Sequence, residues 1–246
     1  MTTSILRAGR VALVTGGNKG IGLAIVRGLA MQGLTVLLGA RSQTAGRTAA
    51  ESLEGDVRPV LLDVTNQDQV DAVAAMVETE FGKLDVLVNN AGVNTLTFHS
   101  MDQLPKPTEE TVEDIRNVYE VNVFAVVRMM NAFLPLLMKA DVPRVVNVTS
   151  KRGSLGEAGA WVGEPSMVYS SSKTALNALT AHYAREFAGT KLKINGAAPG
   201  HVATAFNNFR GTRTPDEGAT VAVRLATLGP DGPTGTVYED DVRLAW

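Results

Sequence analysis

The sequence predicts an α/β fold in which helices flank a doubly wound parallel sheet. Short apolar segments alternate with segments of helical periodicity along the 246 residues. The short segments are continuously apolar, which is typical of strands buried on both faces of a parallel sheet. The first of them leads directly into a glycine-rich turn and a helix, the order that opens a βαβ unit. A chain of this length fits a single domain over residues 1–246.

The N-terminal half begins the strand–helix alternation. Brief apolar runs predict strands at Val11–Thr15, Thr35–Ala40, Arg58–Asp63 and Leu84–Asn89. Apolar residues at helical spacing predict helices at Gly20–Gln32, Ala45–Leu53 and Gln67–Phe81. Ligands of such sheets bind beyond the carboxyl ends of the strands, so the residues that follow each strand are candidates for a site.

The C-terminal half continues the alternation with longer connections. Helices are expected at Val112–Lys139 and Val168–Phe187, and strands at Arg144–Thr149 and Lys191–Ala198. Gly235–Tyr238 is expected to add an edge strand. Long loops are predicted at Thr95–Pro107, Gly153–Pro165 and Gly200–Pro215. Loops of such length in a compact domain are often functional.

Composition excludes several classes of function. A net charge of −2 without a basic run argues against nucleic acid as a partner. No cysteine is present, and His99, His182 and His201 lack the spacing of metal ligands, so no metal site is expected. We see no secretory signal and no apolar stretch of the roughly 20 residues that cross a membrane. The simplest expectation is a cytoplasmic protein without a membrane partner.

The turn after the first strand predicts an anion site. Gly16, Gly20 and Gly22 let the backbone turn, approach a pyrophosphate and bring the helix close to the strand. Asn18, Lys19 and Ile21 complete this turn. Backbone N–H groups at a helix N-terminus favour phosphate. A glycine turn alone can also be purely structural.

A tyrosine and a lysine share one face of a predicted helix. Tyr169 and Lys173 stand four positions apart, so their side chains lie on the same side. An ammonium beside a phenol favours the phenolate, and we expect it to lower the pKa of Tyr169. Such a tyrosine can give a proton to a carbonyl oxygen or take one from an alcohol. The alternative is a structural tyrosine beside a solvated lysine.

Other candidate polar residues lie at the ends of predicted strands or within an apolar segment of a predicted helix. Ser150 ends the strand before the tyrosine helix, where its hydroxyl could hold a substrate oxygen or cap a turn. Asn89–Gly92 follows another strand and fits a turn. Asn122 lies within an apolar helical stretch, where a buried amide needs hydrogen-bond partners.

In this order along nearly the whole chain, these motifs resemble the short-chain dehydrogenase/reductase family, which has a Rossmann-type fold. Thr15–Arg27 and Thr214–Ala219 look especially like the carbonyl reductases of that family. The matching residues are Thr15, Gly16, Gly20 and Gly22 of the glycine turn, Asn89–Gly92, the tetrad Asn122, Ser150, Tyr169 and Lys173, and the turn Pro199-Gly200.

The resemblance implies a role for each member of the tetrad. Tyr169 would be the general acid in reduction, and Lys173 would lower its pKa and bind the nicotinamide ribose. Ser150 would bind the substrate carbonyl. Asn122 would position a water in a proton relay toward Lys173. The nicotinamide would then supply hydride. The protein would orient the substrate and provide the electrostatic surroundings.

The resemblance also implies a cofactor, and local residues favour NADP(H). Ala40 stands where NAD-preferring members of the family place an aspartate, and Arg41 follows it. With Lys19 in the glycine turn, two cations are available for a 2′-phosphate. Both could instead be solvated surface charges. The further cofactor-binding residues that the resemblance implies are Asp63 and Val64 at the adenine, Asn90, Ala91, Gly92, Pro199, Gly200, Val202 and Thr204, in addition to Tyr169 and Lys173.

The chain departs from the family pattern between Ser150 and Tyr169, which are further apart than is typical. The family is by default dimeric or tetrameric, but this insertion leaves a monomer open. Leu155 and Trp161 within it could line a substrate pocket or cover exposed core. The segment Ala205–Thr214 is short for a lid over the substrate, which suggests an open site and broad substrate acceptance.

The function predicted is reversible, NADPH-dependent reduction of a small ketone or aldehyde. Two alternatives stay open. One is a regulatory or sensor protein of the same fold that binds NADP(H) without turnover. The other is a 3-oxoacyl or steroid reductase. The pair Lys151-Arg152 beside Ser150 hints at an anionic group on the substrate, or is solvated surface.

Overall fold

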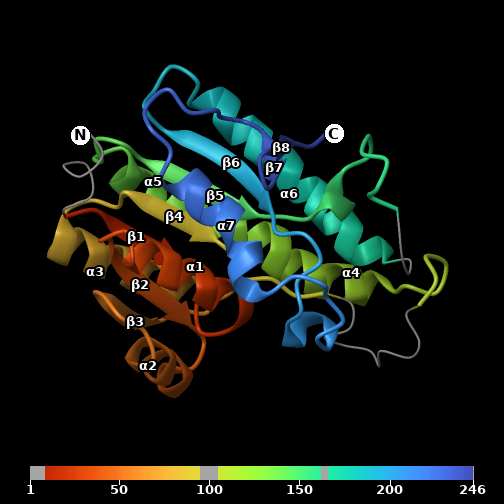
Figure 1. Ribbon diagram of the computed structural model, residues 1–246, viewed down its shortest axis with the longest axis horizontal. Coiled ribbons are helices and arrows are strands. Elements are labelled where there is room, and N and C mark those ends of the chain that lie inside the picture. The colour runs from red at the N-terminus through yellow and green to blue at the C-terminus, as the bar shows by residue number, and fades with distance from the viewer. Residues whose placement is uncertain (1–8, 95–104, 162–165, 246) are drawn as a thin grey trace.

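One twisted sheet organises the computed structural model, which describes residues 9–94, 105–161 and 166–245. Its strand order is β3-β2-β1-β4-β5-β6-β7-β8 (Figure 1). The strands are β1 Val11–Val14, β2 Thr35–Ala40, β3 Val57–Leu61, β4 Val86–Asn89, β5 Arg144–Val148, β6 Lys193–Ala198, β7 Val237–Glu239 and β8 Val242–Arg243. Neighbours pair in parallel from β3 to β7, and β8 pairs antiparallel with β7. The predicted fold class is confirmed.

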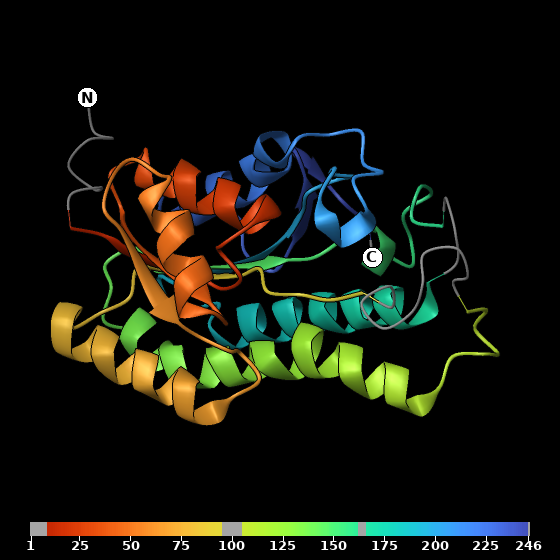
Figure 2. The same ribbon diagram turned by 90° about the horizontal axis from the view of Figure 1, so that it is seen from below.

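Helices cover both faces of this sheet (Figure 2). They are α1 Gly20–Ala30, α2 Gln43–Glu51, α3 Gln67–Phe81, α4 Val112–Tyr119, α5 Ala125–Leu137, α6 Met167–Glu186 and α7 Pro215–Ala226. α1, α2 and α7 lie on one face, and α3 to α6 on the other. Each face has its own apolar core, with Ile25 and Leu225 in one and Phe133 and Leu176 in the other. Burial of the sheet on both faces explains why its central strands are mainly apolar.

The long helix expected at Val112–Lys139 is divided. α4 passes through a π-helical segment, Glu120–Phe124, before α5 begins. Together Val112–Leu137 is 26 residues with a mean hydropathy of 1.4, long and apolar enough to cross a membrane by length and composition, contrary to expectation. Half of its most apolar window is buried inside the fold, and α5 lies against α3. Core packing therefore accounts for its apolar residues.

Two C-terminal predictions need correction. The segment after β6 ends in a helix, α7, which was not predicted although its start carries clear signals. Thr214 and Glu217 form a reciprocal capping box, and Pro215 occupies the first turn. The predicted edge strand is β7, but β8 lies outside it and forms the edge. The loops predicted at Thr95–Pro107 and Gly153–Pro165 fall partly outside the described residues.

Candidate active site

The glycine turn between β1 and α1 has a backbone that only glycine adopts without strain. Gly16 has a φ of 63° and Gly20 a φ of 56°. A Cβ on Gly22 would lie 2.2 Å from the carbonyl oxygen of Gly16. Nδ2 of Asn90 donates to the carbonyl oxygens of Thr15 (2.9 Å) and Gly16 (3.1 Å). The predicted residue Asn90 thus fixes the turn from the end of β4.

The start of α1 is suited to an anion. Its N-cap residue, Lys19, is extended, and no side chain of the described residues caps the helix. Lys19 and Arg41 are exposed, and within the part of the chain that the structure describes neither has an ion-pair partner. Two cations beside helix N–H groups make this end of the site electropositive.

A cavity of about 1290 Å³ runs along the carboxyl ends of the strands. It extends from Arg41 after β2, past the glycine turn, to Tyr169 on α6. It thus crosses the gap between β1 and β4, where the strand order reverses and dinucleotides bind in such sheets. The predicted site residues that line it are Gly16, Asn18, Lys19, Gly20, Ile21, Gly22, Arg41, Asp63, Val64, Asn90, Ala91, Gly92, Ser150, Tyr169, Lys173, Pro199, Gly200, Val202 and Thr204. Only Asn122 of the predicted residues does not.

The cavity fits a dinucleotide on grounds of its own geometry. The glycine turn packs tightly on the start of α1, because a side chain at Gly22 would meet the backbone of Gly16. Asp63 after β3 accepts hydrogen bonds at Oδ1 from the N–H (2.9 Å) and hydroxyl (2.7 Å) of Thr65, which orients its carboxylate at the cavity wall. The methyl group of Thr204 lies against Gly20, with 3.4 Å to an ideal Cβ there. Ordered contacts therefore fix the cavity wall at Asp63 and at Thr204.

Polar bonds hold α6 against β5 and so position the tyrosine. Nδ2 of Asn147 donates to the hydroxyl of Thr180 (2.9 Å), and the hydroxyl of Thr149 donates to Oδ1 of Asn177 (2.6 Å). Gly153 brings the loop after β5 into direct contact with α6, since a Cβ there would lie 2.7 Å from the backbone of Lys173. Their roles were not predicted from the sequence.

Ser150, Tyr169 and Lys173 come together at one end of the cavity. The Ser150 side chain interacts with the Tyr169 hydroxyl, and Nζ of Lys173 lies 5.8 Å from the centroid of the Tyr169 ring. Lys173 is 5% exposed, and its Nζ donates to the carbonyl oxygen of Val148 (2.9 Å). The predicted serine, tyrosine and lysine therefore form one cluster.

Burial dominates the electrostatics of this cluster. It raises the pKa of the Tyr169 hydroxyl above its ordinary 10.0, while the Ser150 side chain and the Arg152 guanidinium act in the opposite direction. The predicted fall in the pKa of Tyr169 is therefore wrong for this structure, because burial outweighs the opposing contributions. Burial also lowers the pKa of Lys173 from 10.5 to about 8. Both effects arise because a low-dielectric surrounding disfavours the charged form.

We expect this buried lysine to make stability depend on pH. Between pH of about 8 and 10.5 the unfolded chain binds the proton that folded Lys173 has lost, so the free energy of unfolding rises with pH there. At about 1.4 kcal/mol per pKa unit, the rise is about 3 kcal/mol. In urea titrations, wild type should gain this amount relative to Lys173→Met between pH 7 and 10.5. Lys191→Met, at an exposed position, controls for loss of a lysine. A constant difference across that range contradicts the assignment.

Asn122 lies beneath the cavity rather than in its wall. It is 1% exposed and belongs to the π-helical segment. Its Oδ1 accepts from the N–H of Val93 (2.9 Å), and its Nδ2 donates to the carbonyl of Val93 (2.8 Å) and the hydroxyl of Ser172 (3.0 Å). These hydrogen bonds connect the chain after β4 to α6. They also satisfy the polar groups of the buried amide.

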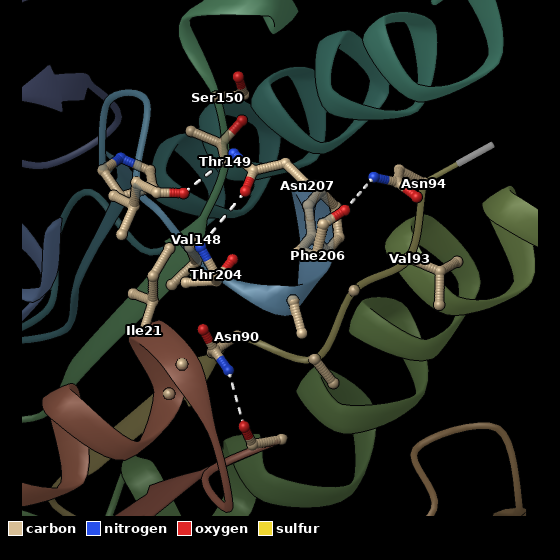
Figure 3. Close-up of a pocket in the computed structure, with 18 of the residues that line it drawn as sticks. Ile21, Asn90, Val93, Asn94, Val148, Thr149, Ser150, Thr204, Phe206 and Asn207 are labelled. Carbon is tan, nitrogen blue, oxygen red and sulfur yellow. Dashed lines mark hydrogen bonds between the residues drawn. The ribbon is translucent and has the colours of Figure 1, made fainter. Parts of the chain in front are cut away.

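Sequence reasoning missed Phe206 and Asn94. The Phe206 ring meets the Tyr169 ring edge-on, with centroids 5.7 Å apart. Nδ2 of Asn94 donates to the carbonyl oxygen of Phe206 (2.8 Å), and Figure 3 shows this bond between the two neighbouring residues. The available signal was an aromatic residue within the loop predicted at Gly200–Pro215.

Residues of the insertion between Ser150 and Tyr169 lie in two different environments. Nζ of Lys151 lies 3.9 Å from Glu157 and 3.6 Å from Glu239, so these carboxylates already neutralise it. Arg152 lines the catalytic cavity. Leu155 and Trp161 do not; they line a second cavity, which favours the pocket interpretation of these residues over core cover.

A glycine turn at the switch point of a Rossmann-type sheet, with a tyrosine–lysine pair across the same cavity, is typical of nucleotide-binding oxidoreductases. Comparison with known proteins narrows this class. A family model described as short chain dehydrogenase matches residues 10–214. The chain belongs to the short-chain dehydrogenase/reductase family, whose members bind a nicotinamide cofactor and act on small molecules. The resemblance given by the motifs is confirmed.

Relatives match along nearly the whole chain. Short-chain dehydrogenase anuI of Penicillium roqueforti is 36% identical over 253 residues, which cover 96% of this chain and 97% of that protein. The structure of salutaridine reductase from Papaver somniferum superposes with a TM-score of 0.80 at 32% identity, covering 93% of this chain and 99% of that one. The Pseudomonas aeruginosa RhlG/NADP active-site complex has a TM-score of 0.83 at 29% identity, covering 98% of each.

Proposed function

We propose that the protein is an NADPH-dependent reductase that converts a ketone or aldehyde to an alcohol, reversibly, with Tyr169 as proton donor. The observation that carries this proposal is the convergence of Ser150, Tyr169 and Lys173 on the cavity that also holds the glycine turn. Proteins similar to this chain include reductases, among them salutaridine reductase. A regulatory protein without turnover has no need of such a cluster.

The chain's own residues act on the carbonyl oxygen. The Ser150 and Tyr169 hydroxyls together orient that oxygen, and burial keeps the Tyr169 hydroxyl protonated at neutral pH. When bound, a reduced nicotinamide supplies hydride to the carbonyl carbon. The Tyr169 hydroxyl gives its proton to the oxygen, and the C=O π bond becomes the O–H bond of the alcohol. Below its pKa the charged Lys173 stabilises the phenolate left behind, until a proton from solvent restores it.

The preference for NADPH rests on Lys19 and Arg41. Both line the cavity, and no acidic residue follows β2 to accept from a ribose hydroxyl. Because a phosphate contact is charge-assisted, Arg41→Ala should raise the KM for NADPH about tenfold to a hundredfold and that for NADH less than threefold. Steady-state kinetics with each cofactor measure this. Arg47→Ala, an exposed arginine on α2 outside the cavity, is the matched control. Equal effects on both cofactors contradict the assignment.

The proposal is tested by following NADPH oxidation with a panel of ketones, aldehydes and quinones, with NADH in parallel. Turnover with NADPH and little with NADH supports both the reaction and the cofactor. Tight NADPH binding without oxidation of any compound favours the regulatory alternative.

A further inference from the structure

The segment after β6 presents two aromatic side chains to the catalytic cavity. Phe206 is 41% exposed and Phe209 69%, and both line the wall of that cavity. Exposed apolar side chains gathered at a concave site are typical of ligand grooves. The ring of Phe206 meets the ring of Tyr169 edge-on, with 5.7 Å between the centroids. Phe206 therefore lies at the reacting end of the cavity.

The loop that carries these two rings is closed at its base. Val202 forms an isolated β-bridge with Arg213, and the N–H of Ala203 donates to the carbonyl oxygen of Arg213 (2.8 Å). Gly211 permits this close approach, because a Cβ there would lie 2.1 Å from backbone atoms of Val202 and Ala203. Residues 204–210 thus form a loop whose two ends are held together.

Phe206 lies in the short 3₁₀ turn Ala205–Asn207, whose backbone is fixed from two directions. The N–H of Phe209 donates to the carbonyl oxygen of Thr204 (2.8 Å), which closes the turn. Asn94, in the chain after β4, donates to the carbonyl oxygen of Phe206 from the other side (Figure 3). The ring of Phe206 is therefore part of an ordered wall.

The same loop holds an aromatic residue in a strained backbone conformation. Asn208 has a φ of 50° and Phe209 a φ of 59°. Asparagine is often found in this left-handed region, but a bulky residue there is an outlier. Such strain persists where the surrounding structure determines it, most often at functional sites. Glycine would adopt this conformation freely, so a phenylalanine here points to a use for its side chain at the cavity wall.

We propose that Phe206 is a specificity-determining residue, whose ring selects substrates in which the carbonyl group is attached to a flat aromatic ring. The proposal rests on the proposed reductase function and specifies its substrate class. Because Phe206 contacts Tyr169, a ring attached to a carbonyl at the Tyr169 hydroxyl comes within the about 4.5–7 Å at which aromatic rings interact. Two aromatic rings gain more from such a contact than their buried area alone provides.

The test compares acetophenone with cyclohexyl methyl ketone, which has the same carbon skeleton without the aromatic ring. Values of kcat/KM with NADPH are measured for both ketones in wild type and in Phe206→Leu, which keeps an apolar side chain but loses the ring. The ratio of kcat/KM for acetophenone over cyclohexyl methyl ketone should fall about twofold to tenfold, the contribution of an aromatic pair. Phe206→Tyr keeps the ring and should keep the ratio near wild type.

Phe124→Leu is the matched control for the loss of an exposed ring. Phe124 is 50% exposed and also meets a tyrosine, Tyr119, edge-on, but it does not line the catalytic cavity. Its replacement should leave the ratio for the two ketones as in wild type. An equal loss of activity toward both ketones in Phe206→Leu, together with a raised KM for NADPH, would make Phe206 a cofactor contact and overturn the proposal.

Binding of the two ketones to the complex with NADP⁺ separates this proposal from the reaction itself, because the oxidised cofactor carries no hydride to transfer. In ligand-observed NMR titrations, Phe206→Leu should weaken binding of acetophenone about twofold to tenfold relative to cyclohexyl methyl ketone. If wild type reduces neither ketone but this difference in binding is found, the reductase function fails and the aromatic site stands. An unchanged ratio with unchanged binding overturns the specificity and leaves the reductase, and failure of wild type to bind acetophenone also overturns it.

Discussion

Replacing Tyr169 with phenylalanine should lower kcat for carbonyl reduction by about a hundredfold to ten-thousandfold, the range contributed by a positioned general acid. The change removes one oxygen atom and leaves the ring against Phe206. Cofactor binding should persist, because the glycine turn and Lys19 lie at the far side of the cavity. Steady-state kinetics give kcat, and the quenching of protein fluorescence by NADPH gives the affinity.

Tyr183→Phe is the matched control for that variant. Tyr183 lies on the same helix, α6, is partly buried, and its pKa is likewise raised, by burial and by Glu186. It does not line the cavity. Loss of a hydroxyl from α6 should therefore matter at one position and not at the other. Full activity of Tyr169→Phe would refute the mechanism.

The residues predicted best from sequence are those whose role depends on local backbone or spacing. A glycine turn directly after a strand needs a positive φ at Gly16 and Gly20, and the structure has both. Tyr169 and Lys173 share a helix face because their spacing requires it. Short apolar runs located the central β strands along the chain, since burial on both faces leaves little choice of residue.

The features missed depend on contacts between distant parts of the chain. Phe206 reaches Tyr169 through a loop held by Asn94, 112 positions away in the sequence. The direction of the Tyr169 pKa shift depends on burial, which spacing to Lys173 does not reveal. The π-helical segment forms where Asn122 bonds the backbone of Val93. The helix α7 is a different case, because Thr214 and Pro215 already signal its start.

The buried lysine and the exposed apolar insertion have a common consequence. Lys173 is held where burial opposes its charge, and Leu155 and Trp161 are held where water contacts apolar surface. Both arrangements are unfavourable for the isolated chain. A ligand that binds only the folded chain at these places should therefore stabilise the fold by mass action.

Gly22→Ala should abolish detectable cofactor binding and lower the free energy of unfolding by about 3 kcal/mol, at the upper end of overpacking effects. Its Cβ would lie 2.2 Å from the carbonyl oxygen of Gly16 and 2.5 Å from Nδ2 of Asn90. The oxygen belongs to backbone and cannot rotate away, so the turn itself must move. Because Asn90 also holds that turn, the movement should break the bonds to Thr15 and Gly16 that define the anion site.

Gly189→Ala is the control for this change, since nothing lies within 4 Å of a Cβ there. It should leave both affinity and stability near wild type. Urea unfolding measures the stability, and fluorescence titration with NADPH measures the affinity. If Gly22→Ala lost stability yet bound NADPH as tightly as wild type, the turn would be a packing feature alone. The glycine turn would then have no part in holding the cofactor, and the anion site would have to lie elsewhere in the cavity.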